Sequence, residues 1–184
     1  MRTQVLIAYC TRSGSTGEVA QAIGQTVSEA GLAVQVKAIA DVESIMAGTE
    51  VVLGTALYIG HFPKEFHQFL TRFEKELAEV RPWVFVLGPT EKERKQFASA
   101  EEQARRELGK HPLLRPADMR VLGGKFDPAH LKLAFPMSLI LKLPANPMKK
   151  IPASDIRDWD WIHRWAGAIA EEIAARMSVS PMVR

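Results

Sequence analysis

The stretch "QVLIAYCTRSGSTGEVA", residues 4–20, decides the fold class of this chain. Its first part is a continuous apolar run of strand length, which is typical of a parallel strand covered on both faces. Its last part begins a helix over Thr16–Ala30, whose apolar face is formed by Val19, Ala20, Ile23 and Val27. Gly31 follows as a natural C-terminal cap. We therefore expect a strand and a helix joined by a tight loop.

The same alternation continues along the chain. Further strands are expected at "AVQVKAI", "EVVLGTA", "PWVFVLG" and "MRVLGG". The expected helices open near Pro63, span Gln96–Leu108 and span Asp158–Met177. The first of these should bury Phe66, Phe69, Leu70 and Phe73, and the last should bury Ile162, Trp165, Ile169 and Ile173. Five strands alternating with helices predict an α/β fold with an open, doubly wound parallel sheet.

Length and composition indicate one compact domain. With 184 residues, of which 47% are hydrophobic, the chain can bury a full core, and we expect residues 1–184 to form a single domain. No apolar segment reaches the length of a membrane span, and the first strand is not preceded by a signal peptide, so we expect a cytoplasmic protein. Cys10 is the single cysteine and is expected to be a small packed hydrophobic residue without a redox role.

The positive charge of the chain is concentrated in one segment. Lysine and arginine outnumber aspartate and glutamate by 24 to 21 over the whole chain. The segment from Lys125 to Arg157 contains six cations and two anions, and six minus two gives it a net charge of +4. The remainder is close to neutral, and we expect no nucleic acid as a partner.

Hydroxyl groups and a glycine crowd the loop between the first strand and the first helix. Gly14 is surrounded by the hydroxyl residues Thr11, Ser13, Ser15 and Thr16. A helix N-terminus at the end of a parallel strand presents free N–H groups and the positive end of the helix dipole. Because the hydroxyls add donors and the glycine lets the backbone approach a ligand, we interpret the loop as a phosphate site. The alternative is that one hydroxyl only caps the helix.

Two common nucleotide motifs are missing from this loop. It has neither the glycine pattern of a dinucleotide-binding fold nor the Gly-Lys-Ser/Thr ending of a triphosphatase loop, which leaves a smaller phosphate ester. The pattern Thr-x-Ser-Gly-x-Thr at Thr11–Thr16 resembles the phosphate loop of flavodoxins, which hold FMN. This resemblance implies the strand order 2-1-3-4-5 and two further loops around the flavin, at Ala56–Phe62 and Leu87–Glu93.

The flavodoxin resemblance also implies a set of FMN-binding residues. They are Thr11, Arg12, Ser13, Gly14, Ser15 and Thr16 in the first loop, Ala56, Leu57, Tyr58, Ile59 and Gly60 in the second, and Gly88, Pro89, Thr90 and Glu91 in the third. Tyr58 is the candidate for stacking on the flavin ring, and its alternative role is an aromatic plug at the end of the sheet. We interpret His61 as a solvated loop residue, His67 as a residue of the helix surface, and Glu91–Lys95 as an exposed run of mixed charge.

Segments outside the three loops resemble one branch of the flavodoxin superfamily. "LYIGHFPKEFHQFL", "RVLGGKF" and "DIRDWDWIHRWAGAIAEEIA" are similar to menaquinone-dependent protoporphyrinogen oxidases. The resemblance implies an FMN-dependent oxidoreductase of haem biosynthesis, with protoporphyrinogen as substrate and a membrane quinone as acceptor. Since FMN carries that chemistry, we assign no catalytic side chain and no metal site. Asp158 and Asp160 of the "DWDW" motif have the alternative role of favouring the N-terminus of the last helix.

Two other functions stay open at this point. A flavodoxin-type shuttle would exchange electrons with a redox partner protein and have no small-molecule substrate of its own. Shuttles of that family are typically acidic, whereas this chain has an isoelectric point of about 9.1, which favours the enzyme. The third alternative is a domain that has lost its flavin, and the complete phosphate loop argues against it.

A long connection over residues 126–152 interrupts the alternation after the fifth strand. Its core, "HLKLAFPMSLILKLPANPMKK", mixes leucines with lysines. We expect residues 130–150 to contact the inner face of the membrane peripherally, since lysines can reach anionic head groups while leucines enter the interface. The alternatives are packing onto the sheet edge and burial in a homodimer interface.

Overall fold

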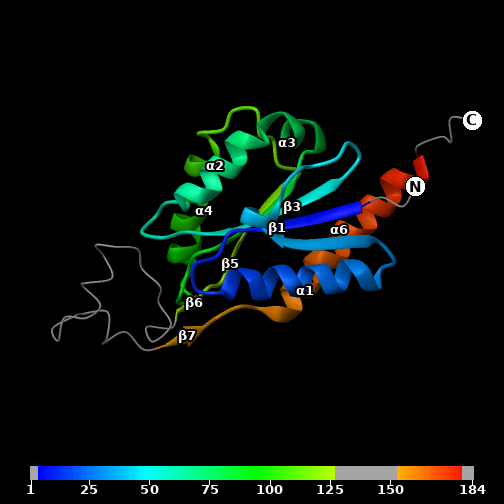
Figure 1. Cartoon of the computed structure of the whole chain (residues 1–184). Helices are drawn as coiled ribbons and strands as arrows, with labels where there is room; N and C mark the ends of the chain where they lie inside the picture. The colour runs from blue at the N-terminus through cyan, green and yellow to red at the C-terminus, as the bar shows by residue number, and fades with distance from the viewer. Residues whose placement is uncertain (1–3, 127–152, 180–184) are drawn as a thin grey trace, which may run out of the picture.

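The computed structural model describes residues 4–126 and 153–179, and Figure 1 shows their arrangement. Its centre is a five-stranded parallel sheet in the order β2-β1-β3-β4-β5. The strands are β1 (Gln4–Tyr9), β2 (Ala33–Ala38), β3 (Glu50–Ala56), β4 (Trp83–Leu87) and β5 (Asp118–Leu122). This confirms the predicted fold class and strand order.

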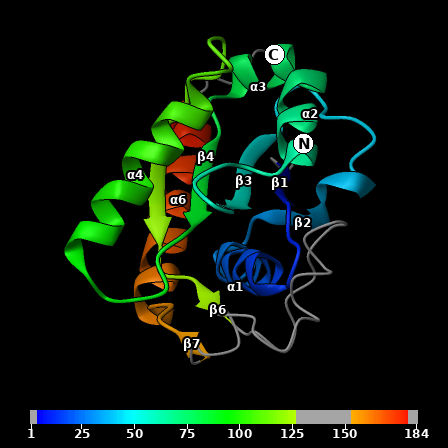
Figure 2. The same cartoon turned by 90° about the vertical axis from the view of Figure 1, so that its left-hand side faces the viewer.

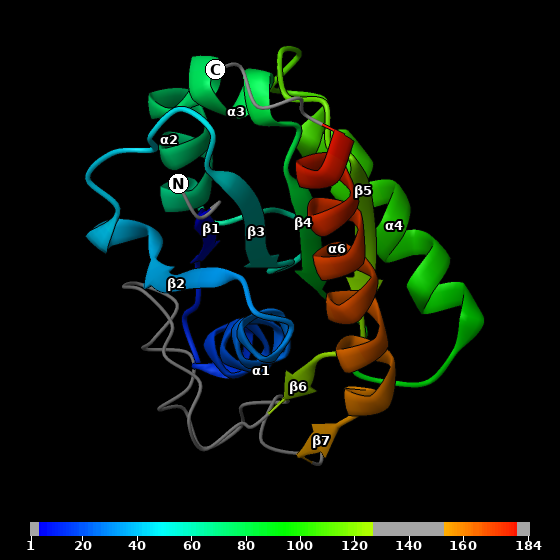
Figure 3. The same ribbon diagram turned by 90° about the vertical axis from the view of Figure 1, so that its right-hand side faces the viewer.

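Helices cover both faces of the sheet (Figure 3). They are α1 (Ser15–Glu29), the 3-10 turn η1 (Ile39–Asp41), α2 (Lys64–Arg72), α3 (Glu74–Val80), α4 (Arg94–Leu108) and α6 (Trp159–Val179). One core lies under α1 and α6, where Ile23 and Ile169 pack with Phe85 of the sheet. The other lies under α2, α3 and α4, where Phe66 and Leu77 pack with Leu53. Burial on both faces explains the continuous apolar runs of the central strands.

The turn from β1 into α1 follows directly from the sequence. Gly14 takes a left-handed backbone conformation with φ of 92°, which glycine adopts without a steric penalty, and α1 begins at the next residue. The helix then packs closely on the sheet, because a Cβ atom at Gly24 would lie 2.4 Å from Cγ2 of Val36. Gly31, with φ of 88°, follows the end of the helix as predicted.

Two features of the fold were not predicted. The short helix α3 follows α2 directly and buries only Leu77. A second, antiparallel sheet pairs β6 (Lys125–Phe126) with β7 (Ser154–Asp155). Apart from Phe126, the predicted insertion over 126–152 lies outside the described residues, and so does the predicted membrane contact of 130–150. None of the helices in the described parts of the chain is long and apolar enough to cross a membrane.

We expect Gly54→Ala to lower the free energy of unfolding by about 1–3 kcal/mol, because the new methyl group overpacks the core. A Cβ atom at Gly54 would lie 2.2 Å from Cζ of Phe85. Gly167→Ala in α6 is the matched control, since no atom lies within 4 Å of its added Cβ, and it should raise stability by about 0.5–1 kcal/mol. Urea denaturation measures both, and equal midpoints for the two variants would contradict the packing described for β3 and β4.

Candidate functional site

The loop Thr11–Thr16 lies at the carboxyl end of β1, on the edge of the sheet that faces the viewer in Figure 2. Gly14 is the N-cap of α1, and no side chain caps this helix. The amide of Gly14 donates a hydrogen bond to Oγ1 of Thr11 at 2.9 Å. The interpretation that one hydroxyl of this loop only caps the helix is therefore wrong.

The N-terminus of α1 contains a buried hydroxyl and backbone amides for which the described residues supply no hydrogen-bond partner. The hydroxyl of Thr16 is fully buried and has no hydrogen-bond partner within the described part of the chain. The amides of Ser15, Thr16 and Gly17 belong to the first turn, where an α-helix offers no acceptor of its own. A buried hydroxyl without a partner is unfavourable, and a bound oxyanion would satisfy it together with these amides.

An ion-pair cluster supports this helix end. Glu18 in the first turn of α1 lies 2.8 Å from Arg157, whose side chain is only 3% exposed, and 3.6 Å from Lys125. Arg157 also pairs with Asp155 and donates to the carbonyl of Ser15. The hydrogen bond from Arg157 is the main cause that lowers the pKa of Glu18. Glu18 is thus neutralised by its partners, and the helix dipole stays available to an anion.

The cluster includes two cations of the basic segment from Lys125 to Arg157. Of its six cations, only Lys125 and Arg157 lie in the described residues, and both are engaged by Glu18. The Arg157 side chain is buried, so this guanidinium does not face solvent. Its charge therefore stabilises the first turn of α1 and does not contribute to an exposed basic patch.

The second predicted loop is a tight turn at the carboxyl end of β3. The amide of Leu57 donates to the carbonyl of Leu87, which ties the loop to the end of β4 at 2.8 Å. Tyr58 and His61 pair through their backbones, and Ile59 and Gly60 between them have φ of 52° and 78°. Ile59 is 85% exposed although it is apolar and takes a left-handed conformation. The turn therefore presents its tip to solvent.

Tyr58 joins the second loop to the phosphate loop. Its hydroxyl oxygen accepts a hydrogen bond from the amide of Arg12 at 3.2 Å, and the guanidinium of Arg12 lies 4.8 Å from the centre of its ring. Burial raises the pKa of Tyr58. Arg12 also lies 3.7 Å from Glu65 of α2. The ring of Tyr58 packs against the core under α1 and α6, and its stacking on a flavin stays a prediction.

The third predicted loop follows β4. Gly88 donates to Leu122 of β5, and the carbonyl of Pro89 accepts from the amide of Gly124 at 2.6 Å. The carboxylate of Glu91 accepts from the side chain of Gln96. Residues 91–95 are exposed, which confirms the expected run of solvated charge. The structure thus brings all three predicted loops, including Ala56 and Thr90, to one edge of the sheet.

Two histidine predictions and one cysteine prediction can now be compared with the structure. The side chain of His67 is only 23% exposed and contacts the buried Glu107, so its assignment to the helix surface is wrong. His61 is 66% exposed, as predicted, but it also contacts Glu107. Cys10 is buried at 7% exposure, and burial raises its pKa to about 11, which confirms a packed thiol.

Sequence reasoning missed Glu107 and Arg157 as residues that support these loops. Glu107 stands in "EEQARRELGK", where nothing distinguishes it from exposed neighbours of the same helix. Arg157 precedes the "DWDW" motif, in which Asp158 accepts a hydrogen bond from the amide of Trp161 and so caps α6. That cap confirms the role of Asp158 at the helix N-terminus.

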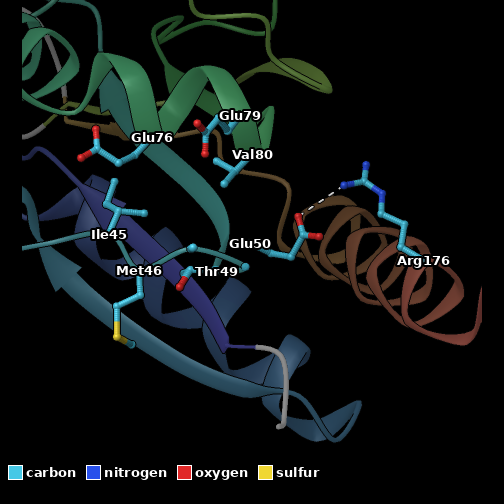
Figure 4. A pocket seen from close by; sticks show the side chains of 10 residues that line it. Ile45, Met46, Thr49, Glu50, Glu76, Glu79, Val80 and Arg176 are labelled. Carbon is cyan, nitrogen blue, oxygen red and sulfur yellow. Dashed lines mark hydrogen bonds and ion pairs between the residues drawn. The ribbon is translucent and has the colours of Figure 1, made fainter. Parts of the chain in front are cut away.

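Two pockets lie at opposite edges of the sheet. A pocket of about 820 Å³ lies beside the exit of β5, between Lys92, Phe97 and the aromatic start of α6 at Trp159 and Trp161. It adjoins the third loop. A smaller pocket of about 470 Å³ lies at the other edge, where Glu50 begins β3 and pairs with Arg176 (Figure 4). Of these two pockets, the larger one has a residue of the third loop, Lys92, in its lining, and the smaller one has none.

Comparison with known proteins gives one family and many similar structures. Residues 6–140 match the family described as Flavodoxin domain. No curated protein matches the chain in sequence.

The solved structures that resemble the chain include several flavodoxins. Oxidised flavodoxin 2 from Bacillus cereus is 19% identical, with 95% of this chain and 99% of that chain covered and a TM-score of 0.55. A mutant flavodoxin from Pseudomonas aeruginosa is 19% identical, with 90% and 98% covered and a TM-score of 0.53. The rubredoxin oxygen:oxidoreductase from Desulfovibrio gigas is 13% identical over 96% of this chain and 37% of that chain, with a TM-score of 0.55. At these identities the likeness establishes a shared fold.

We expect Arg157→Met to lower the free energy of unfolding by about 1–3 kcal/mol at neutral pH, because it leaves Glu18 and Asp155 without their buried cation. Arg176→Met is the control, since the Arg176 side chain is 40% exposed, and it should cost less than about 1 kcal/mol.

The effect of Arg157→Met should depend on pH. The folded pKa values of Glu18 and Asp155 lie below their ordinary values of 4.5 and 3.8. Their stabilisation is therefore present above those values and is lost as the pH falls through the folded pKa values. The difference between wild type and Arg157→Met should shrink below about pH 4, and a difference that grows there would contradict the assigned pairs.

Proposed function

This chain belongs to the flavodoxin domain family, and from that premise we propose that it is a flavin protein that transfers electrons between partners. The family and its flavodoxin neighbours point to FMN as the cofactor. The rubredoxin oxygen:oxidoreductase shares the fold over part of its length, which supports an oxidoreductase role in the broad sense. The proposal concerns electron transfer itself and assigns no physiological donor or acceptor.

The observation that carries the proposal is the unsatisfied N-terminus of α1. The buried hydroxyl of Thr16 lacks a partner among the described residues, and the first-turn amides lack acceptors in the helix. The phosphate of FMN supplies acceptor oxygens and negative charge, which suit these donors and the helix dipole. The side chains of this loop therefore fit the phosphate group of the cofactor.

The other two loops fit the ring of the cofactor. Leu57–Gly60 and Gly88–Glu91 would border the ring, since they flank the same edge as the phosphate loop. Bound FMN supplies the redox chemistry, because flavins accept and release electrons. The chain contributes a phosphate cradle, a fixed turn at Tyr58–His61 and an anchored backbone at Pro89.

The electron-transfer function is better supported than the oxidase function. Neither the family match nor the similar flavodoxin structures single out the protoporphyrinogen oxidase branch, so that activity and its quinone acceptor stay predictions from resemblance. Flavodoxin-domain membership fits a carrier whose partners are redox proteins. The basic isoelectric point, about 9.1, differs from that of the typical acidic shuttle, so the proposal requires partners with an acidic docking surface.

We expect Thr16→Val to weaken FMN binding by about tenfold or more, because the phosphate loses a charge-assisted hydrogen bond. The same variant should raise the stability of the flavin-free protein by about 1 kcal/mol, since the unsatisfied hydroxyl is replaced by a methyl group. Flavin fluorescence quenching and urea denaturation measure the two effects.

Thr55→Val is the matched control for Thr16→Val. Thr55 is also buried without a partner in the described residues, but it lies two residues after Leu53 in β3 and therefore faces the α2–α4 side of the sheet, away from α1. Thr55→Val should raise stability in the same way and leave the FMN dissociation constant unchanged. An absence of quenching in the wild type at micromolar FMN would overturn the proposed function.

The redox function can be tested on the FMN-loaded wild type after anaerobic reduction. For an electron carrier, ferricyanide or cytochrome c should reoxidise the reduced flavin, and protoporphyrinogen added to a separate sample with oxidised flavin should not reduce it. Stopped-flow spectroscopy at the flavin band gives both rates. Rapid reduction of the oxidised flavin by protoporphyrinogen, followed by reoxidation with menaquinone, would instead support the oxidase.

A further inference from the structure

Glu107 places an ionised carboxylate inside the protein, near the second loop. It stands in the last turn of α4 and is only 1% exposed. Its Oε1 accepts from Nζ of Lys110 at 2.6 Å and from Nδ1 of His61 at 3.2 Å. Its Oε2 accepts from the amide of Phe62 at 3.2 Å and from Nε2 of His67 at 2.9 Å. Four donors therefore share one buried acid.

These contacts define the protonation of the cluster. Burial alone would raise the pKa of Glu107, but the hydrogen bonds from Lys110, His67, His61 and the Phe62 amide outweigh it and lower the pKa to about 2. An ionised carboxylate only accepts hydrogen bonds, so Nδ1 of His61 and Nε2 of His67 carry hydrogens. Nδ1 of His67 lies 2.8 Å from Nε2 of His111, so one of these two nitrogens donates a hydrogen bond to the other. Each carboxylate oxygen of Glu107 thus accepts two hydrogen bonds.

The cluster is arranged as a hydrogen-bonded anchor and not as a metal site. Within the described residues, no group of three or more His, Cys, Asp or Glu side chains is placed to hold a metal ion. The rings of His67 and His111 are nearly parallel, with an angle of 19° between their planes and centroids 5.2 Å apart, and their facing nitrogens lie 2.8 Å apart. Lys110 occupies one oxygen of Glu107 and balances its charge.

Two of the four donors to Glu107 belong to the end of the second loop. His61 closes the turn with Tyr58, and Phe62 is the next residue. The tip of the turn contains Ile59, which has a strained backbone and a side chain that is 85% exposed. A tip without a buried side chain depends on contacts at the two ends of the turn. Leu57 holds one end to β4, and Glu107 holds the other end to α4.

We propose that Glu107 is a positioning residue that fixes the turn of residues 57–61 against α4 and thereby sets the ring environment of the cofactor. The inference rests on the proposed function for its cofactor, whereas the anchoring of the turn can be measured without flavin. Glu107 touches no part of the phosphate loop, so its effect should fall on the ring and not on the phosphate. This distinguishes it from Thr16.

The test compares Glu107→Met with wild type in the flavin-free protein and with both FMN and riboflavin. Met has similar length but accepts no strong hydrogen bond, so hydrogen exchange of the Phe62 amide should be about tenfold faster or more. FMN and riboflavin should both bind about threefold to thirtyfold more weakly, and by the same factor, because the turn is no longer pre-organised. Thr16→Val should weaken FMN alone.

Glu101→Met is the matched control, because Glu101 lies on the same helix, is half exposed and pairs only with Arg105 in the described structure. It should change neither the exchange of Phe62 nor the binding of either flavin. If Glu107→Met does not fold, Glu107→Gln keeps the volume and one acceptor oxygen, and it should accelerate exchange at Phe62 by about threefold or more.

Three results would decide against the proposal. Unchanged exchange at Phe62 would show that Glu107 does not hold the turn. Equal acceleration at Phe62 and at Val84 and Phe85 of β4 would show a general loss of stability. A loss of FMN binding with riboflavin binding preserved would place the effect at the phosphate. A wild type that binds neither flavin would contradict the proposed function, whereas the exchange data would still decide whether Glu107 fixes the turn.

Discussion

Parallel pairing of all five strands is the constraint on which the rest of this structure depends. Each strand must be followed by a connection that crosses a face of the sheet, so helices cover both faces and every strand ends at the same edge. Three loops that are far apart in the sequence meet there: residues 11–16, 56–60 and 88–91. A candidate cofactor site at this edge is therefore a consequence of topology before any side chain is considered.

The sequence was a good guide wherever one physical signal was strong. The apolar run Val5–Ala8 is buried on both faces, and the stripe from Ile162 to Ile173 is the buried side of α6. The short helix α3 was missed because it buries a single residue, Leu77, which gives no periodicity. The β6–β7 pair was missed because two residues per strand leave no pattern.

The same distinction between strong and absent sequence signals applies to the residues of the candidate site. The phosphate loop could be predicted because its glycine and hydroxyls are adjacent in sequence. The supporting groups could not, since Glu107 reaches Phe62 across 45 residues and Arg157 reaches Glu18 across 139 residues. A buried glutamate in a charge-rich helix is indistinguishable from its exposed neighbours until the fold brings donors to it. His67 was misjudged for the same reason, because its buried partner was unknown.

The β6–β7 pair joins two positions that are far apart in the sequence. Phe126 pairs with Ser154, and Lys125 pairs with Asp155. This ladder fixes the relative position of the two strands, whatever the number of residues between them. For flexible connections in general, the entropy cost of closure grows by only about 0.6 kcal/mol for each doubling of length. Relatives could therefore differ in the number of residues between these two strands while the sheet and its three loops stay the same.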